Sequence, residues 1–267
     1  MDALWNTLVI IFPSLVSGTI LTLVISVIAG ILAMLVSIPA GLGRLSRVSV
    51  IRSVSAFYVE TIRGTPLLFQ LLVWGFGVQI LLVSLFGFSA DQFIYNILTA
   101  LNSNSLFPSA GISALFFGII GLGVNYGAYM AEVIRAGVLA VEQGQTEAAL
   151  SLGLSRAQTT RFVILPQAFR IMIPPLTNNF ITLVQDTAFL GPAVGVYQIE
   201  LVIQTSVQAT SSPVIRWGLY IVELALYFVI CYSLALISIS AMLSQLPCLG
   251  VWWNSKRWRS RWASAGA

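Results

Sequence analysis

The sequence predicts an all-α integral membrane protein with about five transmembrane helices. Of its 267 residues, 58% are hydrophobic and only 8% are charged, whereas a typical soluble domain carries about 25% charged residues. The apolar residues also gather in long runs, and a helix needs roughly 20 of them to cross the hydrocarbon core of a bilayer. We therefore expect one transmembrane domain over residues 1–267.

Five apolar segments have the composition of membrane-spanning helices. They lie near Leu15–Ala40, Tyr58–Phe86, Gly111–Gly137, Ile171–Leu190 and Trp217–Leu246. The fourth is shorter than the others and is interrupted by Asp186 and by the Gly191-Pro192 pair. An odd number of spans places the two termini on opposite sides of the membrane.

The basic residues predict the orientation of these spans. The segments that follow spans 1, 3 and 5 carry 12 of the 13 Lys and Arg residues, and only Arg216 falls on the other side. Because cytoplasmic loops carry an excess of Lys and Arg, we expect the N-terminus outside and the C-terminus in the cytoplasm.

Two segments outside the spans follow from this orientation. Residues 247–267 form a basic cytoplasmic tail, and residues 87–110 form an outer loop without a basic residue. Apolar residues from Ala90 to Leu101 recur at helical spacing, which predicts a short amphipathic helix on the outer membrane surface. The sequence leaves two functions open for this helix, which are packing on the membrane and docking of an outside partner.

The composition excludes several kinds of site. The chain has no histidine and a single lysine, Lys256, so His-based catalysis, His-ligated metals and a lysine-containing phosphate loop are excluded. Cys231 and Cys248 lack the spacing of a zinc site. We expect no catalytic residue, no metal and no bound cofactor in this chain. The basic residues lie at the ends of apolar runs, which indicates topology rather than nucleic-acid binding.

The cytoplasmic segment 140–170 is predicted to form two short helices with a sharp corner. Gly153 suits the left-handed position that ends the first helix. Ser155 and Gln158 have the spacing of a capping box that begins the second. Glu147-Ala148-Ala149 gives a small-residue face with one charge. Such a rigid projection suits docking to a soluble partner, and a plain structured loop is the alternative.

Three motifs resemble those of a known family. Glu147-Ala148-Ala149, Gly153 and Val163-Ile164-Leu165-Pro166 resemble the EAA motif of ABC importer permeases, whose usual form has isoleucine at Val163. Tyr58–Leu71 and Tyr126–Arg135 are similar to signatures of the polar amino acid (histidine/glutamate/glutamine-type) permease subfamily. So are Thr177-Asn178 and Gln185-Asp186-Thr187, although the subfamily often has lysine at Gln185 and serine at Ala188. The resemblance covers residues 13–245.

The resemblance implies a permease subunit of a type I ATP-binding-cassette importer in a bacterial inner membrane. Its cargo would be a polar amino acid or an amino acid derivative, and the resemblance does not specify which one. It implies as partners two cytoplasmic ABC ATPase subunits that hold ATP and Mg, a second permease subunit (the same chain or a relative) and an external binding protein. Segment 140–170 would be the coupling loop, and the residues set against the ATPase would be Glu147, Ala148, Ala149, Gly153, Leu165 and Pro166.

Charged residues in or beside the spans are candidates for function, because each costs about 2.5–3.5 kcal/mol at the centre of a bilayer. Glu60 and Arg63 are three residues apart, as are Glu132 and Arg135. Each pair is expected to neutralise locally or to cross between helices. Exchange of partners during gating is the alternative to a structural role.

Asp186 has no basic residue within a helical turn. Its carboxylate could meet the amino group of a cargo, accept hydrogen bonds from the broken backbone, or pair with another chain. Gln185 and Thr187 stand beside it. By resemblance, Gly64-Thr65-Pro66 lies near the translocation core, and these residues together form the candidate substrate pathway.

Small residues at a spacing of four predict that each of two spans packs closely against another helix, and a sliding contact in the transport cycle is the alternative. The small residues are Ala29, Ala33 and Ser37 in span 1, and Gly123, Gly127 and Ala131 in span 3.

Two other functions compete with an importer subunit. A stand-alone channel or secondary transporter for small polar solutes would predict broken helices in both halves of the chain, and only one span is broken. A membrane anchor of a redox complex would normally need haem-ligating histidines.

Overall fold

The computed structural model describes residues 2–87, 112–196 and 198–244, and its regular elements there are helical throughout. This confirms the predicted all-α class. The predicted outer helix between Ala90 and Leu101 and the basic tail 247–267 lie outside the described residues.

Four helical segments of the described part are long and apolar enough to cross a membrane. They are Leu4–Arg44, Leu67–Phe86, Leu115–Leu139 and Pro213–Ser240. They belong to α1 (Asp2–Arg44), to the run α3 (Leu67–Leu72), η1 (Val73–Gly77) and α4 (Val78–Phe86), to α6 (Ile112–Leu139) and to α12 (Pro213–Ser244). The chain is therefore an integral membrane protein.

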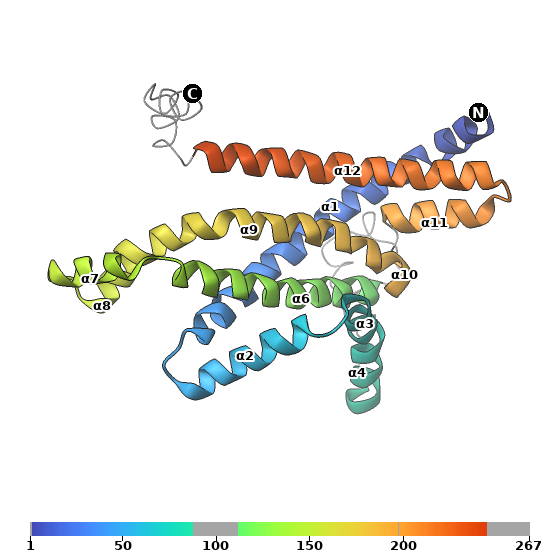
Figure 1. Cartoon of the computed structure of the whole chain (residues 1–267). Coiled ribbons are helices and arrows are strands. Elements are labelled where there is room, and N and C mark those ends of the chain that lie inside the picture. Colours follow the sequence, from blue (N-terminus) through green and yellow to red (C-terminus); the bar gives the residue numbers. More distant parts are fainter. Residues whose placement is uncertain (1, 88–111, 197, 245–267) are drawn as a thin grey trace, which may run out of the picture.

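The predicted fourth span corresponds to α9 (Leu165–Asp186), which lies between α6 and α12 (Figure 1). Its 22 residues give a length of about 33 Å, enough to cross the hydrocarbon core. It is too polar to count among the four apolar spans, so its crossing of the membrane stays a prediction.

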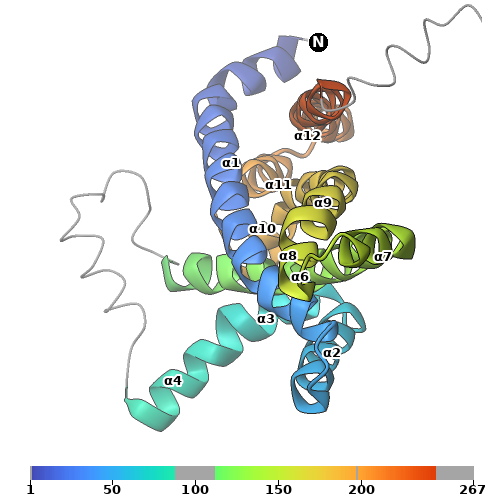
Figure 2. The ribbon, with the colours of Figure 1, turned by 90° about the vertical axis from the view of Figure 1, so that its left-hand side faces the viewer.

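The first helix is longer than the predicted span. α1 contains 43 residues and includes Pro13 and Pro39, because between Asp2 and Arg44 no charged residue interrupts the apolar run. Figure 2 shows α1 changing direction near its N-terminal end. Pro13 lies in that part of the helix, and proline removes one backbone hydrogen bond.

The predicted second span, Tyr58–Phe86, is interrupted at Gly64-Thr65-Pro66, and its apolar membrane-spanning part is Leu67–Phe86. α2 (Ser49–Arg63) ends before Gly64, and Pro66 has an extended backbone with φ −63° and ψ 134°. Pro66 has no N–H to continue the helix, and it disfavours helical geometry at Thr65. After this break α3 and α4 leave the direction of α2 (Figure 1).

The core lies where α1 crosses α6, and small residues permit it. Ala29 and Ala33 are fully buried. A Cβ added to Gly123 would lie 2.6 Å from the Leu32 side chain, and one added to Gly127 would lie 3.1 Å from Val36. The first distance is shorter than real Cβ contacts and the second is tighter than most of them, so these two glycines allow α1 and α6 to pack closely.

The two ends of α9 lead to different parts of the structure. Its N-terminal end follows α7 (Gln143–Ser151), α8 (Arg156–Thr159) and η2 (Thr160–Ile164), which project at one end of the helices (Figure 1). Its C-terminal end leads into η3 (Thr187–Phe189), α10 (Leu190–Val194) and α11 (Ile199–Ala209). One continuous helix thus connects the projecting segment with Asp186.

Candidate functional site

The corner of the projecting segment is formed by backbone hydrogen bonds around Gly153. The Leu154 N–H donates to Ala149 O (3.2 Å) and the Gly153 N–H donates to Leu150 O (3.0 Å). Gly153 has φ +83°, which is the left-handed conformation that ends a helix in this hydrogen-bonding pattern. The predicted left-handed position is therefore confirmed.

The second short helix begins with the predicted capping box. The Gln158 N–H donates to Ser155 Oγ (3.3 Å), and the Ser155 N–H donates to Gln158 Oε1 (2.9 Å). A π-helical turn follows, in which the Leu165 N–H bonds to Thr160 O. The next residue, Pro166, has no proton to donate, so a wider turn here loses no additional hydrogen bond.

The residues of the EAA-like motif differ in exposure. Glu147, Ala148, Leu165 and Pro166 are exposed, whereas Ala149 is buried against the adjacent helices. The corner itself exposes 84% of Leu152. The EAA-like motif therefore presents apolar side chains and the Glu147 carboxylate to the solvent, on a backbone fixed by the hydrogen bonds above.

A cluster of ion pairs joins three helices near the same end of the structure. Arg44 of α1 pairs with Glu132 of α6 at 2.9 Å and with Glu60 of α2 at 3.2 Å. The Arg135 Nε–H donates to the second oxygen of Glu132 (2.9 Å). The local Glu132–Arg135 pair forms, but Glu60 pairs across helices with Arg44 rather than with Arg63.

Arg63 takes a different partner. Its guanidinium lies over the ring of Tyr129, with the guanidinium carbon 5.3 Å from the ring centroid. The ring of Tyr129 is in turn 6.1 Å from that of Tyr126. A continuous row of side chains therefore runs along α6 from Arg63 to Tyr126.

Asp186 is bound to α6 through Tyr126. The Tyr126 hydroxyl donates to Asp186 Oδ2 at 2.5 Å. Tyr126 is buried and lies near the middle of α6, so this contact is at the centre of a predicted span. Of its neighbours, Gln185 is exposed, and Thr187 is buried with its hydroxyl donating to Val184 O (2.7 Å). In the described part of the chain no ion pair involves Asp186.

The Gly64-Thr65-Pro66 break is held against the same turn of α6. The Gln70 amide donates to Ile62 O (2.7 Å) and to Thr65 Oγ1 (2.7 Å). The Asn125 amide donates to Gln70 Oε1 (3.0 Å). Asn125 directly precedes Tyr126, so the structure brings Asp186 and the Gly64–Pro66 break to adjacent residues.

Sequence reasoning assigned no side-chain contact to Arg44, Gln70, Asn125 or Tyr126. The available signal was their polarity, because each lies within or at the end of an apolar run. It identifies residues that need a partner but not which partner, since these contacts join segments far apart in the sequence.

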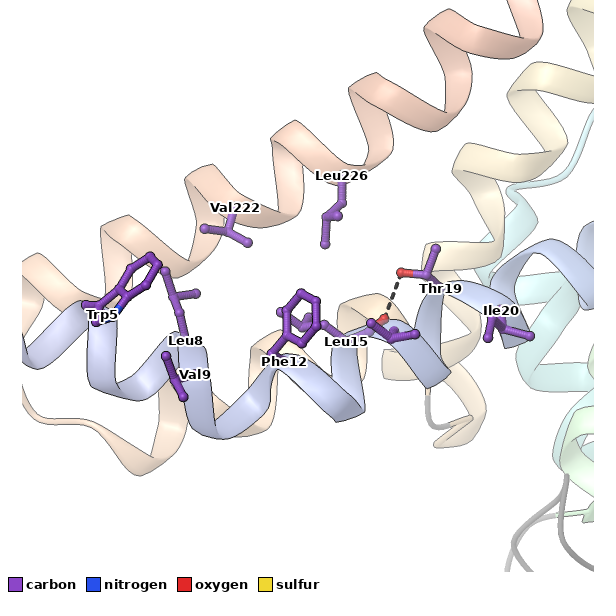
Figure 3. A pocket seen from close by; sticks show the side chains of 10 residues that line it. Trp5, Leu8, Val9, Phe12, Leu15, Thr19, Ile20, Val222 and Leu226 are labelled. Atoms are coloured by element: carbon purple, nitrogen blue, oxygen red, sulfur yellow. Dashed lines mark hydrogen bonds between the residues drawn. The ribbon is translucent and has the colours of Figure 1, made fainter.

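An apolar groove lies between the N-terminal part of α1 and α12 (Figure 3). It has a volume of about 670 Å³, and its walls are formed by Trp5, Leu8, Val9, Phe12, Leu15, Val16, Thr19, Ile20, Val222 and Leu226. The Thr19 hydroxyl donates to Leu15 O within the helix (2.7 Å). The groove therefore offers no side-chain charge to a polar solute, and it is not a candidate for the pathway.

Comparisons with known proteins agree with the geometry. Residues 33–246 match the family of binding-protein-dependent transport system inner membrane components. The L-cystine transport system permease protein TcyB of Bacillus subtilis (strain 168) is 32% identical over 85% of this chain and 84% of the relative. The glutamine transport system permease protein GlnP of Escherichia coli (strain K12) is 33% identical over 69% of this chain and 73% of the relative.

Solved structures show the same fold. A crystal structure of an amino acid ABC transporter with histidines has a chain that is 31% identical, with a TM-score of 0.70 over 90% of this chain and 97% of that one. The MetNI methionine ABC transporter in an inward facing conformation is 21% identical, with a TM-score of 0.60 over 86% of this chain and 97% of that one. The chain therefore belongs to the family of inner membrane components of binding-protein-dependent transport systems, and it is a permease of the amino acid ABC transporter type rather than an enzyme.

Proposed function

We propose that this chain imports a polar amino acid, or an amino acid derivative, delivered by an external binding protein. It works in a bacterial inner membrane with its N-terminus outside, its C-terminus in the cytoplasm and α9 as a fifth span. A second permease subunit and two cytoplasmic ABC ATPase subunits, which bind ATP and Mg, complete the transporter. The observation that carries the proposal is the rigid, solvent-exposed α7–α8 projection at the start of the helix that ends at Asp186.

Coupling follows from this connection. The projection, residues 140–170, docks on an ATPase subunit through Glu147, Ala148, Gly153, Leu165 and Pro166, while buried Ala149 packs the projection onto its own helices. The Gln167 amide also contacts Gln145 Oε1 (3.3 Å), which ties α7 to the beginning of α9. When ATP binding moves the ATPase subunits, α9 transmits the shift and changes the surroundings of Asp186.

The ion pairs of Arg44 exchange partners during this movement, so the cluster has two alternative arrangements. Arg44 bridges helices α2 and α6, and α6 also carries Tyr126. A shift of α9 against α6 changes which partners Arg44 and Arg63 can reach. ATP moves the equilibrium only if the ATPase binds one of these arrangements more tightly than the other.

Asp186, with Gln185 and Thr187 beside it and the Gly64–Pro66 break opposite, forms the cargo pathway. The Asp186 carboxylate accepts a hydrogen bond from the cargo's amino group in place of the one from the Tyr126 hydroxyl. Asp186→Asn removes the charge and keeps the shape, so we expect weaker uptake of the cargo, measured as the concentration for half-maximal uptake. Tyr126→Phe keeps the negative charge of Asp186 and serves as the matched control variant. Unchanged affinity and rate of uptake in Asp186→Asn would refute the contact between Asp186 and the cargo.

The complex itself tests the function. The tagged chain is extracted from its native membranes in mild detergent, and every co-purifying protein is identified and counted. We expect a nucleotide-hydrolysing subunit in an amount equal to that of the permease chains. A chain that is purified alone, under conditions that preserve such complexes, would support the stand-alone channel instead.

A further inference from the structure

The groove between the N-terminal part of α1 and α12 follows from the way α1 is held at two points. At one point, a Cβ added to Gly218 of α12 would lie 2.7 Å from the Leu4 side chain, so the two helices touch there. At the other, a Cβ added to Gly18 would lie 3.0 Å from the backbone of Gln198, at the start of α11. Between these contacts, in the part of α1 that contains Pro13, the groove separates α1 from α12 (Figure 3).

The groove lies over an apolar cluster shared by three helices. Across it, Leu226 of α12 faces Phe12 of α1 (Figure 3). None of the residues that form its wall carries a charge, and the Thr19 hydroxyl is bonded within its own helix. The buried members of the cluster, contributed by α1, α11 and α12, are Leu15, Val202, Ile203, Val207 and Leu219. An occupant of the groove therefore meets hydrocarbon along nearly all of the wall.

The groove has the depth of one leaflet of a bilayer. Both α1 and α12 are long and apolar enough to cross a membrane. Trp5 and Trp217 follow and precede the two residues of the Leu4–Gly218 contact, and both are exposed; tryptophan is enriched where a bilayer meets water. From Trp5 to Ile20 the wall runs about 22 Å along α1, whereas half of the hydrocarbon core is about 15 Å deep. The groove thus begins at the membrane surface and extends through one leaflet, which is the outer one in the proposed orientation.

The volume of the groove suits hydrocarbon chains better than a helix. An extended hydrocarbon chain is about 4–5 Å thick at van der Waals contact, so about 22 Å of it occupies roughly 350–430 Å³. A helix with its side chains is about 10 Å across, and the same length occupies roughly 1,700 Å³. The groove, at about 670 Å³, holds one to two chains but less than half of a helix. A helix of a second copy of this chain therefore does not fit in it.

We propose that the groove binds the acyl chains of a phospholipid of the outer leaflet, with the headgroup at the level of Trp5 and Trp217. An unfilled groove would leave its wall without dispersion contacts, and lipid tails are the apolar molecules at this depth of a bilayer. Because the wall has no charge, it selects hydrocarbon and no particular headgroup. The site uses the proposed orientation of the chain but does not depend on the import function.

The bound lipid joins two helices that otherwise touch little. α12 packs mainly on α9 and α11 and has few contacts with α1, so the acyl chains supply packing that the protein itself lacks. A chain enclosed by α1, α11 and α12 also exchanges more slowly than one that lies on the outer face of α12. This difference in exchange separates the site from the ordinary lipid around a membrane protein.

The test uses the complete transporter in nanodiscs of phosphatidylethanolamine and phosphatidylglycerol. Part of the phosphatidylethanolamine carries a photoreactive diazirine halfway along one acyl chain. The complex is transferred to mild detergent, which removes loosely held lipid, and is then irradiated, and the labelled residues are mapped by mass spectrometry. We expect at least fivefold more label on the groove wall than on the outer faces of the same two helices.

Two pairs of variants separate the groove from the surrounding lipid. Leu226→Trp and Val9→Trp each fill the groove from one wall and should reduce the label on the opposite wall at least fivefold. Leu224→Trp and Ile10→Trp place the same side chain on the outer faces, where Leu224 is 70% and Ile10 is 78% exposed, and should leave the label unchanged. Since Val9 is itself exposed, Val9→Trp keeps the test valid if Leu226→Trp disturbs folding.

The outcomes distinguish a lipid from a protein occupant. Equal label on the groove wall and the outer faces, no retained lipid, or an equal fall in the groove and control variants would each overturn the proposal. A photoreactive amino acid in place of Phe12 should capture phospholipid, whereas capture of a second permease chain would assign the groove to a subunit contact and also overturn the proposal. Import is measured separately, as ATP-driven uptake, so a failed lipid site leaves the proposed function untouched.

Discussion

A valine in place of Gly153 should uncouple the permease from its ATPase while the protein remains inserted in the membrane. Gly153 has φ +83° and ends α7. Valine, whose side chain branches at Cβ, strongly disfavours positive φ. The substitution therefore acts on the corner of the projection and on nothing else in the membrane domain.

The size of the effect follows from the surroundings of Gly153. A Cβ added there meets no atom within 4 Å, so the cost is backbone strain and not a steric clash. Holding an ordinary residue in a sparsely populated backbone region costs about 1–3 kcal/mol. Since 1.4 kcal/mol is about tenfold in an equilibrium constant, the equilibrium constant that favours the native corner should fall about 5- to 150-fold.

The assay is ATP-driven uptake into proteoliposomes that contain the complete transporter. We expect Gly153→Val to lose uptake by at least fivefold, with an unchanged amount of inserted protein. Gly153→Asn is the matched variant, because asparagine is comparable in size to valine and tolerates positive φ, so it should retain most of the uptake. Equal loss in both variants would show that side-chain bulk matters rather than backbone geometry, and normal uptake in Gly153→Val would refute the coupling role.

Three further predictions concern the contacts inside the membrane domain, each measured by the melting temperature of the purified complex. Arg44→Gln should destabilise it by about 1.5–3 kcal/mol, because the largely buried carboxylate of Glu132 loses a charged partner; exposed Arg52→Gln is the control, and an equal melting temperature in both variants would contradict the role of the cluster. Gly123→Val should cost about 1–3 kcal/mol through overpacking, since its Cβ would approach a side chain of α1 to 2.6 Å; wild-type stability would show that α1 and α6 are not closely packed. Asn125→Ala should cost about 1–3 kcal/mol by leaving the buried amide of Gln70 without its donor, and no change would mean that water replaces this contact.

Local features could be predicted from the sequence because they depend on neighbouring residues. The turn at Gly153 and the capping box of Ser155 and Gln158 are decided within a few positions, and both have the predicted geometry. That α1 and α6 each pack closely against another helix was also predictable, because small residues every fourth position leave a groove that another helix can occupy; that they pack against each other was not.

Features that depend on competition between distant partners were not predictable. Glu60 has Arg63 one turn away, but Arg44 reaches it from another helix. Tyr126 and Asp186 are 60 residues apart, and nothing local to either one identifies the other. A bend at Gly64-Thr65-Pro66 could be expected from the sequence, since proline interrupts a helix, but the Gln70 amide that donates to the freed Ile62 backbone oxygen could not.

The docking of the α7–α8 projection on an ATPase subunit is the central claim, and cross-linking tests it most directly. A photoreactive amino acid is placed at Leu152, which is 84% exposed at the corner, and at Val214, which is exposed at the start of α12. The complex is then irradiated in native membranes. We predict a cross-link from position 152 to a nucleotide-hydrolysing subunit and none from position 214. No ATPase cross-link from position 152, or an equal one from position 214, would contradict the proposed coupling.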